Sequence, residues 1–161
     1  MANRVPRPRS SNAVPTAAQL NDLLGYRINR LSAAMGQQAD RDARSLAGLT
    51  LAEYRVCAVL LLSGPQGVAA LQQITLIDKA WISRTLTRLT KKAMVRGRAD
   101  PDDGRRTSFE LTAKGQRAAS TLIDQSRKRQ AGFLRGVSPA ERAVLIELLE
   151  RVQRNIEGNS R

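Results

Sequence analysis

The sequence contains no histidine and a single cysteine, Cys57. Without histidine, the chain lacks the most common general base and the most common metal ligand. One cysteine excludes an intrachain disulfide and a thiolate metal cluster. We therefore expect no metal and no cofactor. This cysteine usage fits a reducing compartment, so we expect a cytoplasmic protein.

Aromatic residues are also few, and long apolar runs and catalytic motifs are missing. The longest apolar run, residues 56–62, is far shorter than the roughly 20 residues of a membrane helix. The N-terminus lacks the apolar core of a signal peptide, so secretion is not expected. Phe, Tyr and Trp make up 3% of the residues, which disfavours an aromatic platform for RNA. No phosphate-binding glycine loop, nucleophile motif or pair of carboxylates in an apolar setting is present, so no catalytic residue and no enzyme are predicted.

Acidic residues are few. The chain has 14 Asp and Glu against 27 Lys and Arg, a formal net charge of +13. Such an excess favours a polyanionic partner, with nucleic acid first and an anionic membrane surface second. On charge alone, a protein that is merely basic and soluble remains the alternative.

Capping signals divide the chain into helices. Thr16 and Gln19 form a capping box before an apolar stripe at helical spacing, which predicts one long helix fading near Gly48. Thr50 and Glu53 form a second box, which opens an apolar helix. The residues before the first box hold three Arg, three Pro and no acid, and they are predicted to form a flexible basic arm.

The central segment combines helices with a hairpin. A short helix is predicted at 68–74, followed by a helix that Asp78 caps and that runs to about Ala93. Strand-like segments at 95–99 and 107–111 flank a turn rich in Asp, Pro and Gly.

The C-terminal part is helical. Thr112 is predicted to cap a helix that runs to about Arg135. Ser138, Pro139 and Glu141 give a strong start signal for a last helix. Six helices and a two-stranded wing are therefore expected.

This order of parts predicts a winged helix-turn-helix. A basic amphipathic helix can fill a major groove of DNA, and a basic hairpin beside it can reach the neighbouring minor groove. The expected fold is mainly α with a small two-stranded β-wing, flanked by N- and C-terminal dimerisation helices. The outer helices would leave apolar stripes in water, so we expect a C2 homodimer. The predicted domains are a basic arm (1–15), an N-terminal dimerisation helix (16–48), a winged helix-turn-helix (49–111) and C-terminal dimerisation helices (112–157).

The helix that begins at Asp78 has two faces. On a helical wheel its packing face carries Ile82, Leu86, Leu89 and Ala93. The opposite face and its flanks carry the predicted DNA contacts Ser83, Arg84, Thr87, Arg88 and Lys91. Arg84 is the first choice for base readout, while Arg88, Lys91 and Lys92 are predicted to hold phosphates. The alternatives are a solvated face and a membrane-surface helix.

The hairpin and two single residues complete the candidates. Arg98, Arg105 and Arg106 gather around the turn and predict an anionic partner, with a salt-bridged surface hairpin as the alternative. Either Asp102 or Asp103 can pair with Arg105. Trp81 is expected at the edge of the packing face beside the helix at 68–74, with a ligand or sugar-phosphate contact as the alternative. Cys57 is predicted to be a small buried hydrophobe.

Several of these segments resemble the MarR family of bacterial transcriptional regulators. The matching segments are LTLAEY (49–54), DKAWISR (78–84), DPDDGRR (100–106), LTAKG (111–115) and SPAE (138–141). Each segment alone is a weak signal, but five in the right order and spacing are fairly specific. With the first helix included, the resemblance covers nearly the whole chain beyond the N-terminal arm.

The resemblance implies an obligate homodimer that binds a pseudo-palindromic operator and usually represses nearby genes. By position, Ser83 and Arg84 become recognition contacts, and Asp103 with Arg105 match the Asp-x-Arg pair of the family's wing. Many relatives bind small, often anionic aromatic ligands between the dimerisation helices and the DNA-binding lobe. The corresponding candidates here are Tyr26, Arg27, Tyr54 and Trp81.

The chain departs from the family pattern at four positions. Ala93 stands where the family often has Gly, and Gly97 where an Arg is frequent. Leu76 replaces a small residue of the turn, and Trp81 occupies a position often held by Thr. These changes leave the expected fold intact but bear on the register of the first wing strand and on the operator sequence.

The sequence thus predicts a specific regulator of transcription that binds double-stranded DNA, acts as a homodimeric repressor and is released by a small ligand. Its expected location is the cytoplasm, at the nucleoid when bound to DNA. An architectural DNA binder without base readout is the alternative, and an RNA-binding protein comes third.

Overall fold

The computed structural model describes residues 17–99 and 107–158. The predicted basic arm, the capping residue Thr16 and the wing-tip residues Asp103, Arg105 and Arg106 lie outside these ranges. The chain forms two compact units, residues 1–38 and 39–161.

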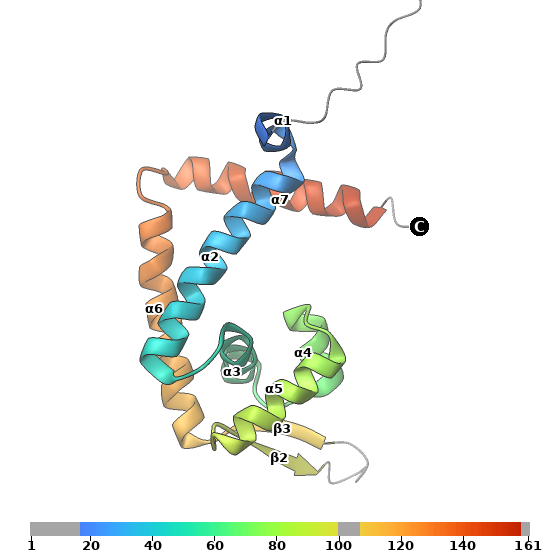
Figure 1. Cartoon of the computed structure of the whole chain (residues 1–161), viewed down its shortest axis with the longest axis vertical. Helices are drawn as coiled ribbons and strands as arrows, with labels where there is room; N and C mark the ends of the chain where they lie inside the picture. Colours follow the sequence, from blue (N-terminus) through green and yellow to red (C-terminus); the bar gives the residue numbers. More distant parts are fainter. Residues whose placement is uncertain (1–16, 100–106, 159–161) are drawn as a thin grey trace, which may run out of the picture. The chain divides into compact units, whose positions relative to one another are not determined.

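The first unit contains helix α1, Ala17–Asp22, and the N-terminal part of helix α2, Leu24–Ala47 (Figure 1). The prediction of one continuous helix is wrong here, because the helix is interrupted at Leu23. The backbone carbonyl of Asn21 accepts a hydrogen bond from the Arg27 side chain. A side-chain donor thus takes the place of the backbone N–H that would continue the helix.

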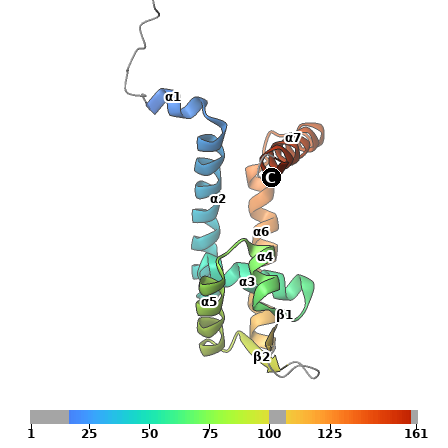
Figure 2. The same ribbon diagram turned by 90° about the vertical axis from the view of Figure 1, so that its right-hand side faces the viewer.

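The second unit continues from the last turns of α2 and is built around helix α3. Its further elements are α3 (Leu51–Ser63), β1 (Gln66–Gly67), α4 (Val68–Thr75), α5 (Lys79–Lys91), β2 (Val95–Ala99), β3 (Thr107–Leu111), α6 (Ala113–Phe133) and α7 (Pro139–Gly158). Helix α3 contacts α4, α5, α6 and β3 (Figures 1 and 2). Because α3 is buried on several sides, it fixes the orientation of α5 relative to the strands.

The sheet has three antiparallel strands in the order β1-β3-β2. The two predicted wing strands are confirmed, with a register that runs from Val95 opposite Leu111 to Ala99 opposite Thr107. The short strand β1 adds a pairing of Gln66 with Phe109. Two residues give no alternating pattern, so β1 could not be predicted from the sequence.

The described caps agree with the sequence. The Thr50 side chain accepts from the Glu53 N–H, and the Glu53 carboxylate accepts from the Thr50 N–H at 2.8 Å. The Thr112 side chain accepts from the Gly115 N–H at 3.1 Å. Ser138 and Glu141 repeat the reciprocal box at the start of α7. Because each cap is formed by two residues three positions apart, the start of each helix can be predicted from the sequence.

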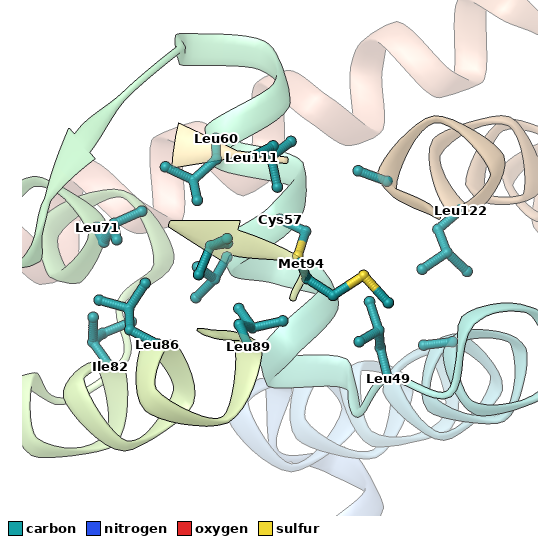
Figure 3. Packing of buried hydrophobic residues seen from close by; sticks show 14 residues of the cluster. Leu49, Cys57, Leu60, Leu71, Ile82, Leu86, Leu89, Met94, Leu111 and Leu122 are labelled. Carbon is teal, nitrogen blue, oxygen red and sulfur yellow. The ribbon is translucent and has the colours of Figure 1, made fainter. Parts of the chain in front are cut away.

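The apolar core lies among α3, α4, α5, the strands and α6 (Figure 3). Its fully buried side chains include the predicted Ile82, Leu86 and Leu89 of α5. Cys57 is also fully buried, as predicted, and burial raises the pKa of its thiol to about 12. At neutral pH this side chain therefore remains a protonated, unreactive thiol.

A line of polar contacts joins α2, α3 and α6 beside this core. The Arg129 guanidinium pairs with the Asp42 carboxylate and also donates to the Ser126 hydroxyl at 2.8 Å. The Ser126 and Tyr54 hydroxyls are hydrogen-bonded at 2.8 Å. Tyr54 therefore uses its polar end to hold α3 against α6.

No single helix of the described chain is long and apolar enough to cross a membrane, although α2 and α3 taken together, as a bent pair, meet the length and composition criterion. Within the same residues, no group of three or more Cys, Asp or Glu side chains is placed to hold a metal ion.

Helix α5 ends in a turn whose last residue is left-handed. Ala93 has φ = 54°, its N–H bonds to the Thr90 carbonyl, and the Met94 N–H bonds to the Leu89 carbonyl. These are the two hydrogen bonds of a Schellman motif, in which glycine is preferred at the left-handed position. The prediction that Ala93 continues the packing face is therefore wrong: the helix has already ended, and Ala93 is exposed.

Replacing Ala93 with glycine should raise the free energy of unfolding by about 1 kcal/mol, because it removes the steric cost of a left-handed L-residue. Urea denaturation followed by circular dichroism measures this change. The control is Ala69→Gly at an exposed position of α4, which should lower stability by about 0.5–1 kcal/mol. A loss of stability in both variants would contradict the prediction.

Candidate nucleic-acid interface

Helix α5 presents one apolar and one polar face. Its first turn is fixed by the Asp78 carboxylate, which accepts from the N–H groups of Ala80 and Trp81 at 2.8 and 3.3 Å. The buried face consists of Ile82, Thr85, Leu86 and Leu89. The exposed face carries the predicted contacts Ser83, Arg84, Thr87 and Lys91. The helix thus has an apolar side that sets its angle and a polar side that is open to a partner.

The two hydroxyls on the exposed face already use their donors. Ser83 donates to the Lys79 carbonyl at 3.1 Å, and Thr87 donates to the Ser83 carbonyl at 3.0 Å. A hydroxyl has one donor and two acceptor positions, so both oxygens can still accept. In this arrangement Ser83 and Thr87 suit the exocyclic amino groups of cytosine or adenine.

The positive side chains on and near α5 include two groups with different surroundings. Arg88 and Lys92 point to Glu53, which is only 1% exposed. The Lys92 ammonium lies 2.8 Å from one oxygen of the Glu53 carboxylate, and the Arg88 Nε lies 3.5 Å from the other. Lys92 also donates to the Gly48 carbonyl at 2.8 Å. These two cations, which the sequence predicts at phosphates, already face a protein anion.

Glu53 is ionised in this setting. Burial by itself raises the pKa of its carboxyl. The hydrogen bonds from Lys92 and from the Thr50 N–H lower this pKa, and together with the positive charge of Lys92 they outweigh the effect of burial. The net effect is a pKa below the ordinary value for glutamate. A buried carboxylate of this kind joins the start of α3 to the end of α5.

Arg84, Lys91 and Arg98 form the second group. All three are exposed, and none forms an ion pair with a residue that the structure describes. The Arg84 guanidinium lies 5.3 Å from the ring centroid of Trp81. These three exposed cations of α5 and β2 remain available for DNA phosphates or bases.

On the wing, two exposed arginines of β2 have different neighbours on β3. Arg96 on β2 pairs with Glu110 on β3 at 2.6 Å, and the two residues are direct neighbours in the register. Arg98 lies opposite Ser108. A Cβ atom at Gly97 would lie 3.3 Å from the Thr107 side chain and 3.6 Å from the Phe109 ring. This close approach favours glycine at the position. The predicted contacts Arg105 and Arg106 and the pair of Asp103 with Arg105 lie beyond the described strands.

The four ligand candidates have different surroundings. In the first unit, Tyr26 lies under the Arg30 guanidinium at 5.9 Å, and Arg27 lines a hollow of about 520 Å³. In the second unit, the Tyr54 hydroxyl is bonded to Ser126, whereas Trp81 is half exposed at the edge of α5.

Sequence reasoning missed two buried polar residues of the site. Glu53 was identified only as part of a capping box, and the buried Thr85, which accepts from Arg88 at 3.2 Å, was not singled out. Both residues become part of the site only because α3 packs on α5. Glu53 and Lys92 are 39 residues apart, so no local pattern joins them.

The short helix α4 and a turn precede the capped helix α5, and an antiparallel wing with basic residues follows it. This order of elements defines a winged helix-turn-helix protein. Residues 47–106 match the sequence model of the MarR family. Over these residues the chain is similar to the MarR family, and solved structures of MarR-family transcriptional regulators share its fold.

Individual relatives agree with this assignment. The uncharacterized HTH-type transcriptional regulator YdgJ of Bacillus subtilis is 35% identical over 86 residues, which span 53% of this chain and 52% of that relative. The HTH-type transcriptional repressor NicR of Pseudomonas putida is 27% identical over 146 residues, or 90% of this chain and 89% of NicR. The crystal structure of a MarR mutant from E. coli complexed with operator DNA has a TM-score of 0.68 and 21% identity, covering 83% of this chain and 96% of that one.

Proposed function

We propose that the chain is a homodimeric repressor of transcription that binds a pseudo-palindromic operator in double-stranded DNA. The observation that carries this proposal is the exposed face of α5, where Ser83, Arg84, Thr87 and Lys91 stand free of protein carboxylates among the described residues. The net charge of +13 favours the approach to DNA. The relative NicR is named a repressor.

The homodimer is proposed from exposed apolar side chains in the outer helices. Helix α7 carries Val144, Leu145, Ile146, Leu148 and Leu149, each about half exposed. In the first unit, Leu23, Leu24 and Leu31 are more than half exposed. Apolar surface of this extent favours association, and a second copy of the chain would bury it. We assign dimerisation to 16–48 and 112–157 and DNA binding to 49–111.

A small anionic ligand that weakens DNA binding completes the proposal. The hollow in the first unit is lined by Asn21, Arg27, Arg30 and Leu31, and two guanidinium groups suit a carboxylate. The exposed Tyr26 ring lies next to Arg30 and offers a surface for an aromatic group. As a DNA-binding regulator, the protein would act in the cytoplasm, at the nucleoid while bound.

The decisive test compares Arg84→Ala with Lys91→Ala in fluorescence anisotropy, using the DNA upstream of the protein's own gene and a shuffled duplex. Arg84→Ala should reduce the preference at one base pair by about 1–3 kcal/mol, because a bidentate base contact is lost. Lys91→Ala should weaken binding to all duplexes alike and reduce the salt slope by about 1.

The same titrations test the remaining parts of the proposal. Two protomers per site are expected, and added benzoate should release the DNA from the wild type more readily than from Arg27→Ala. If the wild type binds the upstream and shuffled duplexes equally, a selection from genomic fragments follows. Failure of that selection would leave a nonspecific, architectural DNA binder.

A further inference from the structure

Trp81 is the only tryptophan of the chain and lies in the first turns of α5. Its side chain is 50% exposed, so part of the ring is open to neighbouring side chains. Two guanidinium groups lie over its ring, Arg84 at 5.3 Å and Arg88 at 5.9 Å from the centroid. Both distances are within the range of cation–π attraction.

The two arginines differ in what else holds them. Arg88 is fixed from the protein side, since it donates to the Thr85 hydroxyl at 3.2 Å and lies 3.5 Å from the buried Glu53 carboxylate. Arg88 is therefore a fixed neighbour of the ring. The ring in turn connects this anchored cation with the one at the exposed face.

Arg84 has no such anchor. Within residues 17–99 and 107–158 its side chain forms no hydrogen bond and no ion pair, so the Trp81 ring is the contact that restrains its guanidinium. An arginine in open solvent samples many rotamers and loses that freedom when it binds. The ring face offers no acceptor atom, so contact with it leaves the N–H donors of Arg84 available for a base.

We infer that Trp81 is a positioning residue, which holds the Arg84 guanidinium over its ring, backed by Arg88 and Glu53, and so sets the base preference of the recognition helix. This inference rests on the proposed function, because it assigns how the helix reads a base. Trp81 acts through Arg84 and makes no base contact of its own.

The test uses Trp81→Leu, which keeps apolar bulk but removes the ring, and Trp81→Phe, which keeps an aromatic face. The wild type and both variants are titrated with a panel of operators that carry single base-pair changes. In Trp81→Leu the preference at the base pair read by Arg84 should fall about two- to fivefold, the factor that an exposed cation–π contact is worth. The preferences at other base pairs should stay unchanged, and Trp81→Phe should restore most of the loss.

The control is the same pair of changes in an Arg84→Ala background, where Trp81→Leu should cause no further loss at that base pair. An equal loss at every base pair, or the same loss without Arg84, would show that Trp81 only supports the fold and would overturn the inference. Thermal unfolding of each variant identifies any that fails to fold, and if Trp81→Leu does, the signal of Arg84 in the folded wild type tests the contact.

A second measurement needs no DNA. In NMR spectra of ¹⁵N-labelled protein, the Arg84 Nε–H signal should be shifted upfield by the ring current of Trp81, and this shift should vanish in Trp81→Leu. Arg98, which lies on the wing, is the internal reference. An Arg84 signal that matches Arg98 and ignores the substitution would refute the positioning role. If instead the shift is present but no duplex is preferred, the proposed function fails while the contact stands.

Discussion

Replacing Glu53 with alanine is expected to lower the free energy of unfolding by about 2–3 kcal/mol, because it removes a buried carboxylate that accepts hydrogen bonds from Lys92 and from the Thr50 N–H. The Glu53 carboxylate is 1% exposed and lies 2.8 Å from the Lys92 ammonium. It also closes the capping box of α3 by accepting from the Thr50 N–H. The substitution would leave Lys92 and Arg88 without their anion, and urea denaturation measures the loss.

The chain offers a matched control for Glu53→Ala. Glu141 occupies the same third position of a capping box, at the start of α7, but it is exposed and faces no buried cation. Glu141→Ala removes the same backbone contact but no ion pair with Lys or Arg in the described chain, so its effect should be much smaller. Equal losses in the two variants would mean that the cap, and not the ion pair, accounts for the stability.

The ion pair also predicts a dependence on pH. The pKa of Glu53 lies below its ordinary value in the folded chain, so its contribution is fully present above the pKa of the unfolded state. The contribution is lost as the pH falls through the folded pKa. The stability difference between the wild type and Glu53→Gln should therefore shrink between about pH 5 and pH 3. A constant difference over this range would argue against an ionised Glu53.

Replacing Gly115 with alanine is expected to destabilise the fold by about 3 kcal/mol or more, since the new methyl group has no room. A Cβ atom at this position would lie 2.0 Å from the Met94 carbonyl oxygen and 3.0 Å from a methyl carbon of Leu111. The Met94 carbonyl cannot move away easily, because it accepts the Thr112 N–H at 3.0 Å. Either the start of α6 or the segment that joins α5 to β2 must shift.

Gly132 lies in the same helix and is the control for Gly115→Ala. A Cβ atom there would meet nothing within 4 Å. Gly132→Ala should leave stability unchanged or raise it by up to about 1 kcal/mol, since alanine is the better helix former. Thermal unfolding of both variants decides the matter, and two similar melting temperatures would contradict the packing argument.

The elements were predictable from the sequence where their determinants are local. Thr50, Asp78 and Ser138 each cap a helix through bonds to residues two or three positions away, and such spacings are visible in the sequence. The packing face of α5 followed from helical periodicity in the same way. Periodicity failed at Ala93. The apolar pattern extends to this residue, but the helix ends before it in a turn with a left-handed residue.

The arrangement of charges at the site was not predictable in the same way. Arg88 and Lys91 look equivalent in the sequence, but only packing of α3 on α5 brings Arg88 to Glu53 and leaves Lys91 exposed. The break at Leu23 depends on a bond from Arg27 to Asn21 that no helix pattern contains. The DNA contacts and the ligand residues Tyr26 and Arg27 stay predictions.

The burial of Cys57 makes the chain a convenient substrate for site-directed labelling. Its thiol is inaccessible and stays protonated near neutral pH. A maleimide dye used at that pH would therefore not react with the native protein. A cysteine placed at an exposed position such as Ser120 of α6 could then carry a fluorophore or a spin label in an otherwise unmodified protein. Distances between two labelled copies, and their change when DNA or a ligand is added, would become accessible without removing any residue of the core.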